Sequence, residues 1–251
     1  MARISPEWRV AGPEARIRLF CFAHAGGGAA FFRPWHGRLG PDVQVCPVVL
    51  PGREARWRER PHTQMDELVE GTMEELRHRL DPPFALFGHS MGAAVVYELC
   101  RRFFPAPGSG PLHLFVSGRR APHLPARHPP VHRLPREQFL QHLDLLNGIP
   151  PGLTGDRDLI DAFLPSLRAD FEVSETYAPP GGPPLPVGVS AMLGADDPAV
   201  NVHEMLGWRD VTDGRFSLRV FTGDHFYLRG GCPDLFAAVR QELTRAIGRV
   251  A

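Results

Sequence analysis

The sequence predicts an α/β protein with a mostly parallel central sheet flanked by helices. Short apolar, β-branched or aromatic runs alternate with segments of helical length along the 251-residue chain. Several of these runs are apolar at nearly every position, as expected for strands buried on both faces of a parallel sheet. A chain of this length fits one domain, 1–251, with a full core and a pocket, although length alone would also allow two small domains.

Six runs are expected to form strands, and they are, in chain order, Ile17 to Phe22, Val43 to Leu50, Phe84 to Phe87, Leu112 to Val116, Val187 to Leu193 and Phe216 to Phe221. The segments between them are expected to form helices, at Ala29 to Leu39, Met65 to Leu80, Ala93 to Phe103, Asn201 to Trp208 and Asp234 to Ile247. This alternation is the βαβ pattern that builds parallel sheets.

One region interrupts the alternation, between the fourth and fifth expected strands. A Pro-, His- and Arg-rich stretch is followed there by helix-like patterns at Arg136 to Leu146 and Arg157 to Tyr177. An insertion of this length is too long for a connecting loop, so we interpret residues 122–177 as a helical lid over a pocket. The alternative is an extra helical layer with only a packing role. The Pro- and Gly-rich stretch Pro179 to Pro184 then returns the chain to the sheet.

Composition excludes several classes of function. Basic and acidic residues number 28 each, and a net charge of zero argues against a nucleic-acid or membrane-surface role driven by bulk charge. The basic residues include no lysine, which removes a lysine base or Schiff base. The four cysteines form no C-x-x-C pair, so a zinc or redox site is not expected. With no signal-peptide pattern or long apolar span, a cytoplasmic protein is the default expectation.

The most informative motif is Gly88-His89-Ser90-Met91-Gly92, which lies between an expected strand and an expected helix. A G-x-S-x-G sequence in this context is the nucleophile elbow of the α/β-hydrolase fold, a strained turn that exposes a serine hydroxyl above the end of a sheet. Its glycines permit close approach of neighbouring backbone and unusual dihedral angles. Ser90 is therefore the candidate nucleophile, and the alternative is a surface turn that happens to contain the same letters.

A serine nucleophile needs a base and a group that orients the base, and in this fold both follow it in the chain, at the ends of later strands. His225 follows the last expected strand in a glycine-containing turn, whereas His203 lies within an expected helix, so His225 is the expected base. His89, beside the nucleophile, is expected to be structural. Asp196 and Asp197 both follow the fifth expected strand; either could reach the imidazole, and we favour Asp197 as the acid.

The tetrahedral intermediate of acyl transfer needs an oxyanion hole of preorganised N–H donors. One donor is the backbone N–H of Met91, directly after the nucleophile and at a helix N-terminus. The second is expected from the loop after the first strand, His24-Ala25-Gly26-Gly27-Gly28, and we assign it to the Ala25 N–H. The alternative, a phosphate-binding loop, is not favoured because the G-x-G-x-x-G and Walker lysine patterns are missing.

Five motifs together resemble the stand-alone type II thioesterases that serve polyketide and nonribosomal peptide synthases. They are Phe22-Ala23-His24-Ala25-Gly26-Gly27, Leu50-Pro51-Gly52-Arg53-Glu54, Gly88-His89-Ser90-Met91-Gly92, Phe163-Leu164-Pro165-Ser166-Leu167-Arg168-Ala169-Asp170-Phe171 and Gly223-Asp224-His225-Phe226. The elbow and the histidine alone would indicate only an α/β-hydrolase, and the other motifs narrow the family. The departures from the family pattern, a third glycine at Gly28 and Cys-Phe-Ala before His24, touch no catalytic group.

The resemblance implies a serine hydrolase that releases acyl groups from the phosphopantetheine arm of an acyl or peptidyl carrier protein and so clears stalled or aberrant chains. It implies Ser90, Asp197 and His225 as nucleophile, acid and base, with the Ala25 and Met91 amides as the oxyanion hole. Serine attack on a thioester needs no metal and no organic cofactor. Neither a nucleic-acid nor a membrane partner is expected.

Three questions stay open at this point. A carboxylesterase or lipase acting on oxygen esters would use the same triad, and a catalytically silent hydrolase-fold protein could act as an interaction module. Arginines near the lid, at Arg119, Arg120, Arg127 and Arg133, could meet an acidic carrier or the phosphate of its arm. The alternative for these arginines is a solvated loop.

Overall fold

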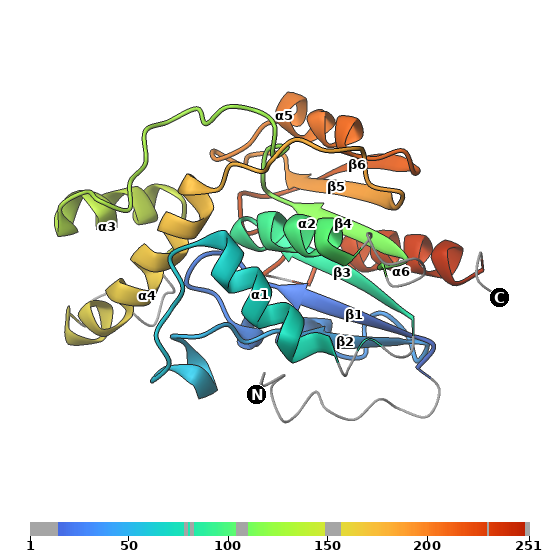
Figure 1. Ribbon diagram of the computed structural model, residues 1–251, viewed down its shortest axis with the longest axis horizontal. Coiled ribbons are helices and arrows are strands. Elements are labelled where there is room, and N and C mark those ends of the chain that lie inside the picture. Colours follow the sequence, from blue (N-terminus) through green and yellow to red (C-terminus); the bar gives the residue numbers. More distant parts are fainter. Residues whose placement is uncertain are drawn as a thin grey trace.

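The computed structural model describes residues 15–77, 80, 83–103, 110–148, 157–229 and 231–248. Six strands form one sheet in the order β2-β1-β3-β4-β5-β6 (Figure 1). They are β1 (Ile17–Phe22), β2 (Val43–Pro47), β3 (Phe84–His89), β4 (His113–Ser117), β5 (Gly188–Gly194) and β6 (Phe216–Phe221). Every neighbouring pair is parallel. The predicted α/β fold is confirmed, with a wholly parallel sheet.

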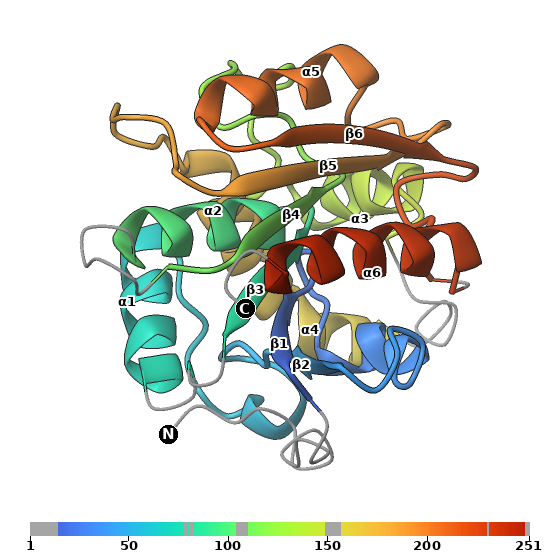
Figure 2. The same cartoon turned by 90° about the vertical axis from the view of Figure 1, so that its right-hand side faces the viewer.

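Helices cover both faces of the sheet, and Figure 2 shows α1 and α2 on one face and α6 on the other. The α-helices outside the insertion are α1 (Met65–Leu76), α2 (Met91–Phe103), α5 (Val202–Leu206) and α6 (Pro233–Ile247). Apolar side chains of α1, α2 and α5 form one core with the sheet, and those of α6 form a second core on the opposite face. The four central strands β1, β3, β4 and β5 are therefore buried on both sides, which explains their nearly continuous apolar sequences.

Several predicted elements differ from the structure. The strand expected to reach Leu50 ends at Pro47 as β2, and the helix expected over Asn201 to Trp208 is α5 followed by a 3₁₀ helix, η5 (Gly207–Val211). The segment expected as a helix from Ala29 to Leu39 is a 3₁₀ helix, η2 (Ala29–Trp35). Pro34 lies inside it and cannot donate a backbone hydrogen bond, and Gly37 follows with a positive φ of 69°. The helix expected to reach Leu80 ends at Leu76 as α1, although residues 78 and 79 of that prediction fall outside the described part of the chain.

The order of the strands creates a switch point between β1 and β3. From β1 the chain crosses to β2 on one side, and it then returns to place β3 on the other side of β1. Beyond the loops that leave β1 and β3, the chain continues from β1 into η2 and from β3 into α2, on opposite faces of the sheet, and the carboxyl ends of strands at such a switch point are where ligands bind in open α/β sheets. These two loops carry Ala25 and Ser90.

The insertion between β4 and β5 holds α3 (Arg136–Leu145) and α4 (Arg157–Thr176), so both predicted helices are present to within a residue at each end. Figure 1 shows them together beyond one end of the sheet. A small apolar cluster joins them, in which Phe139 and Leu143 of α3 meet Leu164, Leu167 and Phe171 of α4. Residues 149–156 lie outside the described residues.

Candidate active site

The turn that carries Ser90 is too tight for any residue but glycine on either side. A Cβ atom at Gly88 would lie 2.2 Å from the Gly92 carbonyl oxygen, and one at Gly92 would lie 2.2 Å from the carbonyl oxygen of Phe22 on β1. Ser90 itself has a φ of 54°, in the left-handed region that L-residues rarely adopt. Its N–H donates to the Ser117 carbonyl at 2.7 Å. The elbow is thus a strained turn pressed against β1 and β4.

The structure places His225 against Asp197. Imidazole Nδ1 lies 2.8 Å from Asp197 Oδ2, and the two side chains are only 5% and 0% exposed. The other oxygen of this carboxylate accepts from the Ala199 N–H at 2.8 Å. Asp196, the alternative acid, is exposed. A hydrogen bond at Nδ1 leaves Nε2 of His225 as the nitrogen that can exchange a proton with a nucleophile.

The loops that carry the acid and the histidine are packed against each other. A Cβ atom at Gly194, the last residue of β5, would lie 2.2 Å from the Asp224 carbonyl oxygen. Gly118, the residue after β4, approaches the imidazole so closely that a Cβ atom there would lie 3.2 Å from a ring carbon of His225. Glycines at the ends of β4 and β5 therefore give the histidine its place above the sheet.

No hydrogen bond between the Ser90 hydroxyl and His225 occurs among the described contacts. Such bonds are often long or poorly aligned in a free enzyme and tighten when substrate binds. The serine is partly exposed at the carboxyl end of the sheet, whereas the histidine is buried against its carboxylate.

The two predicted oxyanion donors come from neighbouring strands. β1 and β3 pair in parallel with Phe22 opposite Gly88, so the chain that continues to Ala25 runs beside the chain that continues to Met91. Met91 is the first residue of α2, where the helix dipole favours negative charge. Within the described residues, neither the Ala25 nor the Met91 N–H donates a hydrogen bond.

A buried layer of polar side chains supports His225. The His89 ring lies 4.9 Å from the His225 ring, centre to centre, and its Nδ1 is 2.9 Å from the Ser117 hydroxyl. That hydroxyl is also 2.8 Å from the Tyr227 hydroxyl. Burial lowers the pKa of His89 well below its ordinary value, so the ring is neutral. Ser117 is fully buried and shared between two partners, which makes it a support and not a second nucleophile.

His24 lies in the loop that follows β1 and packs edge-on against the rings of Phe31 and Phe226, at 4.7 and 4.8 Å between centres. Burial lowers the pKa of His24 to about 3, with a smaller contribution from the nearby His225. The ring is therefore neutral near pH 7 and adds no charge beside the predicted oxyanion hole.

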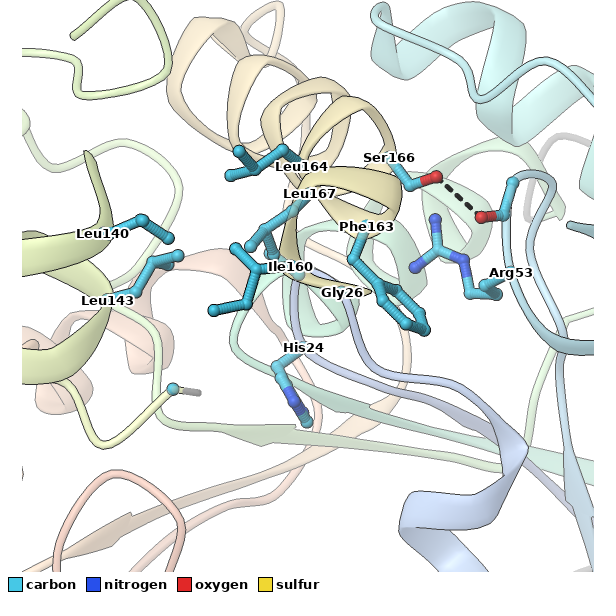
Figure 3. Close-up of a pocket in the computed structure, with 13 residues that line it drawn as sticks. His24, Gly26, Arg53, Leu140, Leu143, Ile160, Phe163, Leu164, Ser166 and Leu167 are labelled. Atoms are coloured by element: carbon cyan, nitrogen blue, oxygen red, sulfur yellow. Dashed lines mark hydrogen bonds between the residues drawn. The ribbon is translucent and has the colours of Figure 1, made fainter. Parts of the chain in front are cut away.

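An apolar cavity of about 380 Å³ opens at the loop that carries Ala25. Figure 3 shows its walls, which α3 and α4 supply largely as aliphatic side chains: Leu140, Leu143, Ile160, Leu164 and Leu167, with the ring of Phe163. His24 and Gly26 line it from the loop after β1, and Arg53 from the loop after β2. The cavity can hold an apolar chain next to Ala25, one of the two predicted oxyanion donors.

A buried ion pair in the wall of this cavity was missed by the sequence analysis. Arg53 donates from Nη1 to Asp170 Oδ2 and from Nη2 to Asp170 Oδ1, both at 2.7 Å. The Gly26 N–H donates to the same Asp170 Oδ2 at 2.7 Å, and Arg53 Nη1 also donates to the Gly27 carbonyl at 3.1 Å. Nearby, the Ser166 hydroxyl donates to the Gly52 carbonyl at 2.6 Å (Figure 3).

This network joins three of the five motifs that carry the family resemblance: the loop after β1, the Pro-Gly-Arg-Glu loop after β2 and the Phe163 to Phe171 segment of α4. Arginine and aspartate are almost never fully buried unless they are paired. An arginine or an aspartate inside an otherwise apolar motif is therefore a sequence sign of such a pair. The pairing itself, across 117 positions of sequence, needed the fold. Its consequence is that α4 is bonded directly to the loop that carries Ala25.

Comparison with known proteins places this site in a family. Residues 17–243 match the family model described as Thioesterase domain. The chain belongs to the thioesterase family. The gramicidin S biosynthesis protein GrsT of Aneurinibacillus migulanus is 41% identical over 214 residues, which cover 85% of this thioesterase and 84% of GrsT.

Solved structures agree with this assignment. RedJ, a thioesterase from the prodiginine biosynthetic pathway in Streptomyces coelicolor, superimposes with a TM-score of 0.85 at 40% identity, over 93% of this chain and 90% of RedJ. BorB, a type II thioesterase from the borrelidin biosynthetic cluster, gives a TM-score of 0.82 at 37% identity and covers 94% of each chain. The protein is thus a type II thioesterase and a serine hydrolase of the α/β-hydrolase fold, as the sequence predicted.

None of the helices in the described ranges of the thioesterase is long and apolar enough to cross a membrane.

Proposed function

We propose that the thioesterase hydrolyses acyl groups from the phosphopantetheine arm of an acyl or peptidyl carrier protein and so clears stalled or aberrant chains in polyketide or nonribosomal peptide biosynthesis. The observation that carries the proposal is an apolar cavity beside the Ala25 loop, in a chain that also holds a buried His225–Asp197 pair. The pathways named for GrsT and RedJ support it. A cytoplasmic location is part of the proposal.

In this mechanism Ser90 attacks the thioester carbonyl while His225 Nε2 accepts the hydroxyl proton. Asp197, at 2.8 Å from Nδ1, holds the ring in the required tautomer and stabilises the imidazolium. The carbonyl oxygen becomes an oxyanion that receives hydrogen bonds from the Ala25 and Met91 N–H groups. Collapse breaks the carbon–sulfur bond, and His225 returns the proton to the departing pantetheine sulfur.

The acyl-enzyme is then hydrolysed by the reverse sequence. Water attacks the Ser90 ester as His225 accepts one of its protons, and the same two amides stabilise the second oxyanion. Breaking the ester bond releases the carboxylic acid and returns the proton to Ser90. Every step uses side chains and amides of this chain.

The insertion, residues 122–177, acts in this proposal as a lid. Both of its helices contribute walls to the apolar cavity, whose lining includes Leu140 and Leu143 of α3 and Ile160 and Leu164 of α4. Since the bound chain contacts mainly these walls, α3 and α4 determine which acyl groups fit.

A panel of acyl-loaded carrier proteins tests the function, with matched acyl oxygen esters as competitors and Ser90→Ala as the control. We expect turnover of the carrier-bound thioesters that the control loses. A wide margin in favour of oxygen esters would show an esterase instead, and full activity in the Ser90→Ala variant would contradict the mechanism.

A further inference from the structure

A second cavity, of about 610 Å³, lies between the insertion and the loops that follow β4 and β5. Pro198 and Ala199, which directly follow Asp197, form part of its wall, and Leu145 and Leu146 at the end of α3 form another part. The apolar cavity contacts α3 through Leu140 and Leu143. Both cavities therefore border α3, and the loop after β5 contributes Asp197 to the proposed active site and Pro198 to the second cavity.

Arginines give the second cavity its character, because Arg119, Arg120 and Arg127 all line it. Arg127 is paired with Glu204 at 3.3 Å. Arg119 donates to the Ser174 hydroxyl at 2.6 Å and to the Ser174 carbonyl at 2.8 Å, and Arg120 donates to the Leu124 carbonyl at 3.2 Å. Within the described residues, neither Arg119 nor Arg120 forms an ion pair with a carboxylate.

The acidic side chains of this cavity are already bonded elsewhere. Glu175 accepts hydrogen bonds from the N–H groups of Val131 and His132 at 2.9 and 3.1 Å and lies 2.6 Å from His132 Nδ1. Glu204 accepts from the Asn201 N–H at 3.0 Å and from Arg127. Glu175 and Glu204 lie near enough to attract Arg119 and Arg120, respectively, but neither carboxylate forms an ion pair with them among the described residues.

The remaining titratable groups do not offset this charge. His128 and His142 also line the cavity, and burial lowers the pKa of His142, which favours its neutral form near pH 7. Burial lowers the pKa of Arg119 to about 10; repulsion from the adjacent Arg120 adds to this shift, and Tyr177 and Glu175 offset it only in part. Both arginines stay cationic, so an anion placed between them would relieve a repulsion that the folded protein sustains.

Guanidinium groups are suited to anions that present two or more oxygens. Their planar forks match the oxygens of phosphate and carboxylate groups, and arginine is favoured where phosphate is recognised. The substrate of the proposed function carries an apolar acyl chain at one end of its arm and a phosphate at the other. The two cavities provide one apolar and one cationic compartment on the same helix.

We infer that Arg119 and Arg120 bind the phosphate of a phosphopantetheine thioester while its acyl chain occupies the apolar cavity. This inference rests on the proposed function. Coenzyme A thioesters carry the same phosphate on the same pantetheine arm, so the shared chemistry is a phosphopantetheine phosphate, whether it is attached to a protein or to a nucleotide.

The test uses two substrates that differ only in that phosphate: an acyl-pantetheine and the same acyl-phosphopantetheine. In the wild type we expect a KM about tenfold lower for the phosphorylated substrate, the size of one charge-assisted hydrogen bond. Arg120→Gln is expected to remove most of this difference by raising the KM for acyl-phosphopantetheine, with the KM for acyl-pantetheine and both kcat values unchanged. Arg120 is preferred for the test because Arg119 also anchors Ser174 of α4.

Arg133→Gln is the matched control, because Arg133 is an exposed arginine of the same insertion, and it should behave as the wild type. Thermal unfolding of all variants shows whether they are equally stable. If Arg120→Gln is less stable, Arg120→Lys replaces it. Because Arg120→Lys keeps the charge, it should retain part of the difference in KM between the two substrates. Equal KM values for the two substrates in the wild type, or an equal loss on both substrates in Arg120→Gln, would overturn the inference.

Two further substrates separate this inference from the proposed function. The acyl-carrier and the acyl-coenzyme A should both lose affinity in Arg120→Gln, and the ratio of the two losses shows which source of the phosphate the cavity serves. A wild type that discriminates by the phosphate but fails on every acyl-carrier would contradict the proposed function and leave the phosphate site standing.

Discussion

Arg53 and Asp170 form a buried two-point ion pair whose carboxylate also accepts the backbone N–H of Gly26. Asp170 belongs to α4, and Gly26 follows Ala25, whose own N–H we propose as an oxyanion donor. The position of α4 and the direction of the Ala25 N–H are therefore linked through one carboxylate.

Asp170→Asn tests this link. The substitution leaves Arg53 buried without its counter-ion, which is expected to cost about 3 to 5 kcal/mol of stability. Because the Gly26 N–H also loses its charged acceptor, we expect kcat on a short acyl thioester to fall by about 10-fold or more, with a small change in KM. Steady-state kinetics and urea unfolding measure the two effects.

A double variant separates positioning from stability. Arg53→Met combined with Asp170→Leu removes both charges and is expected to restore much of the lost stability. It should not restore kcat, since a leucine at position 170 offers the Gly26 N–H no acceptor at all. Recovery of kcat together with stability would assign the ion pair to folding alone. Asp158→Asn, at an exposed acid of the same helix, is the control for both measurements.

Alanine substitutions of the two serines near the site, Ser90 and Ser117, are expected to have very different effects on kcat. Ser90→Ala should lower kcat by about 10⁶-fold, to background, because the nucleophile is lost. Ser117→Ala removes only a support for His89 and Tyr227, and we expect a loss of about 10-fold or less. Labelling with a fluorophosphonate should persist in the Ser117 variant and vanish in the Ser90 variant, and the reverse pattern would exchange their roles.

The adjacent aspartates give an internally controlled pair of variants. Asp197→Asn disturbs the tautomer of His225 and is expected to lower kcat by about 10⁴-fold. Asp196→Asn, at an exposed position one residue away, should leave kcat near that of the wild type. Similar losses in both variants, measured on one thioester substrate, would show that the loop after β5 matters as a whole and that its carboxylate at 197 has no distinct role.

Stability is expected to fall as the pH is lowered below about 6.5. His24 is held neutral in the folded protein with a pKa of about 3 and the pKa of His89 is also lowered, while an unfolded chain takes up a proton on each near pH 6.5. Since the unfolded state binds more protons, the free energy of unfolding rises with pH, by at most about 1.4 kcal/mol per unit for each ring.

Urea unfolding at pH 7 and pH 5 measures this slope. His24→Phe keeps an aromatic ring between Phe31 and Phe226 but removes one titrating group, so the slope should become shallower. His203→Phe, at an exposed position on α5, should keep the slope of the wild type. An unchanged slope in His24→Phe would mean that this ring takes up its proton equally in both states.

The apolar cavity predicts a change in chain-length preference. Leu140→Trp fills part of the cavity from α3, so we expect kcat/KM to fall for long acyl chains and to stay nearly constant for acetyl and propionyl thioesters. Gln141→Trp places the same bulk on the neighbouring exposed position and serves as the control. A uniform loss over all chain lengths in Leu140→Trp would place the acyl chain elsewhere.

Elements that depend on local pattern were predictable from the sequence, and contacts that depend on the fold were not. β1 and β6 have the predicted bounds. An apolar run buried on two faces is a strong local signal for β1, and the half-buried edge strand β6 was marked by its aromatic and β-branched residues. The helix expected after β1 was wrong because Pro34 outweighs the apolar spacing around it.

The same distinction between local pattern and fold-dependent contacts applies to the residues of the site. Ser90 and His225 follow the ends of strands, and a parallel sheet brings such ends to one edge. Asp196 and Asp197 are neighbours in one turn, and only the path of that turn decides which carboxylate meets the imidazole. Arg53 and Asp170 come from separate loops and helices, so their pairing was beyond any local pattern.

The parallel pairing of β1 with β3 has a consequence for how such enzymes diversify. The strands that lead to both proposed oxyanion amides are paired in a hydrogen-bonded ladder inside the sheet, while the walls around the acyl chain come from α3 and α4. Substitutions in these helices can therefore change the accepted substrate without retuning the reaction, except where Asp170 reaches the Ala25 loop. A substitution near Asp170 that changes the accepted acyl chain must also keep the Ala25 N–H in place for catalysis.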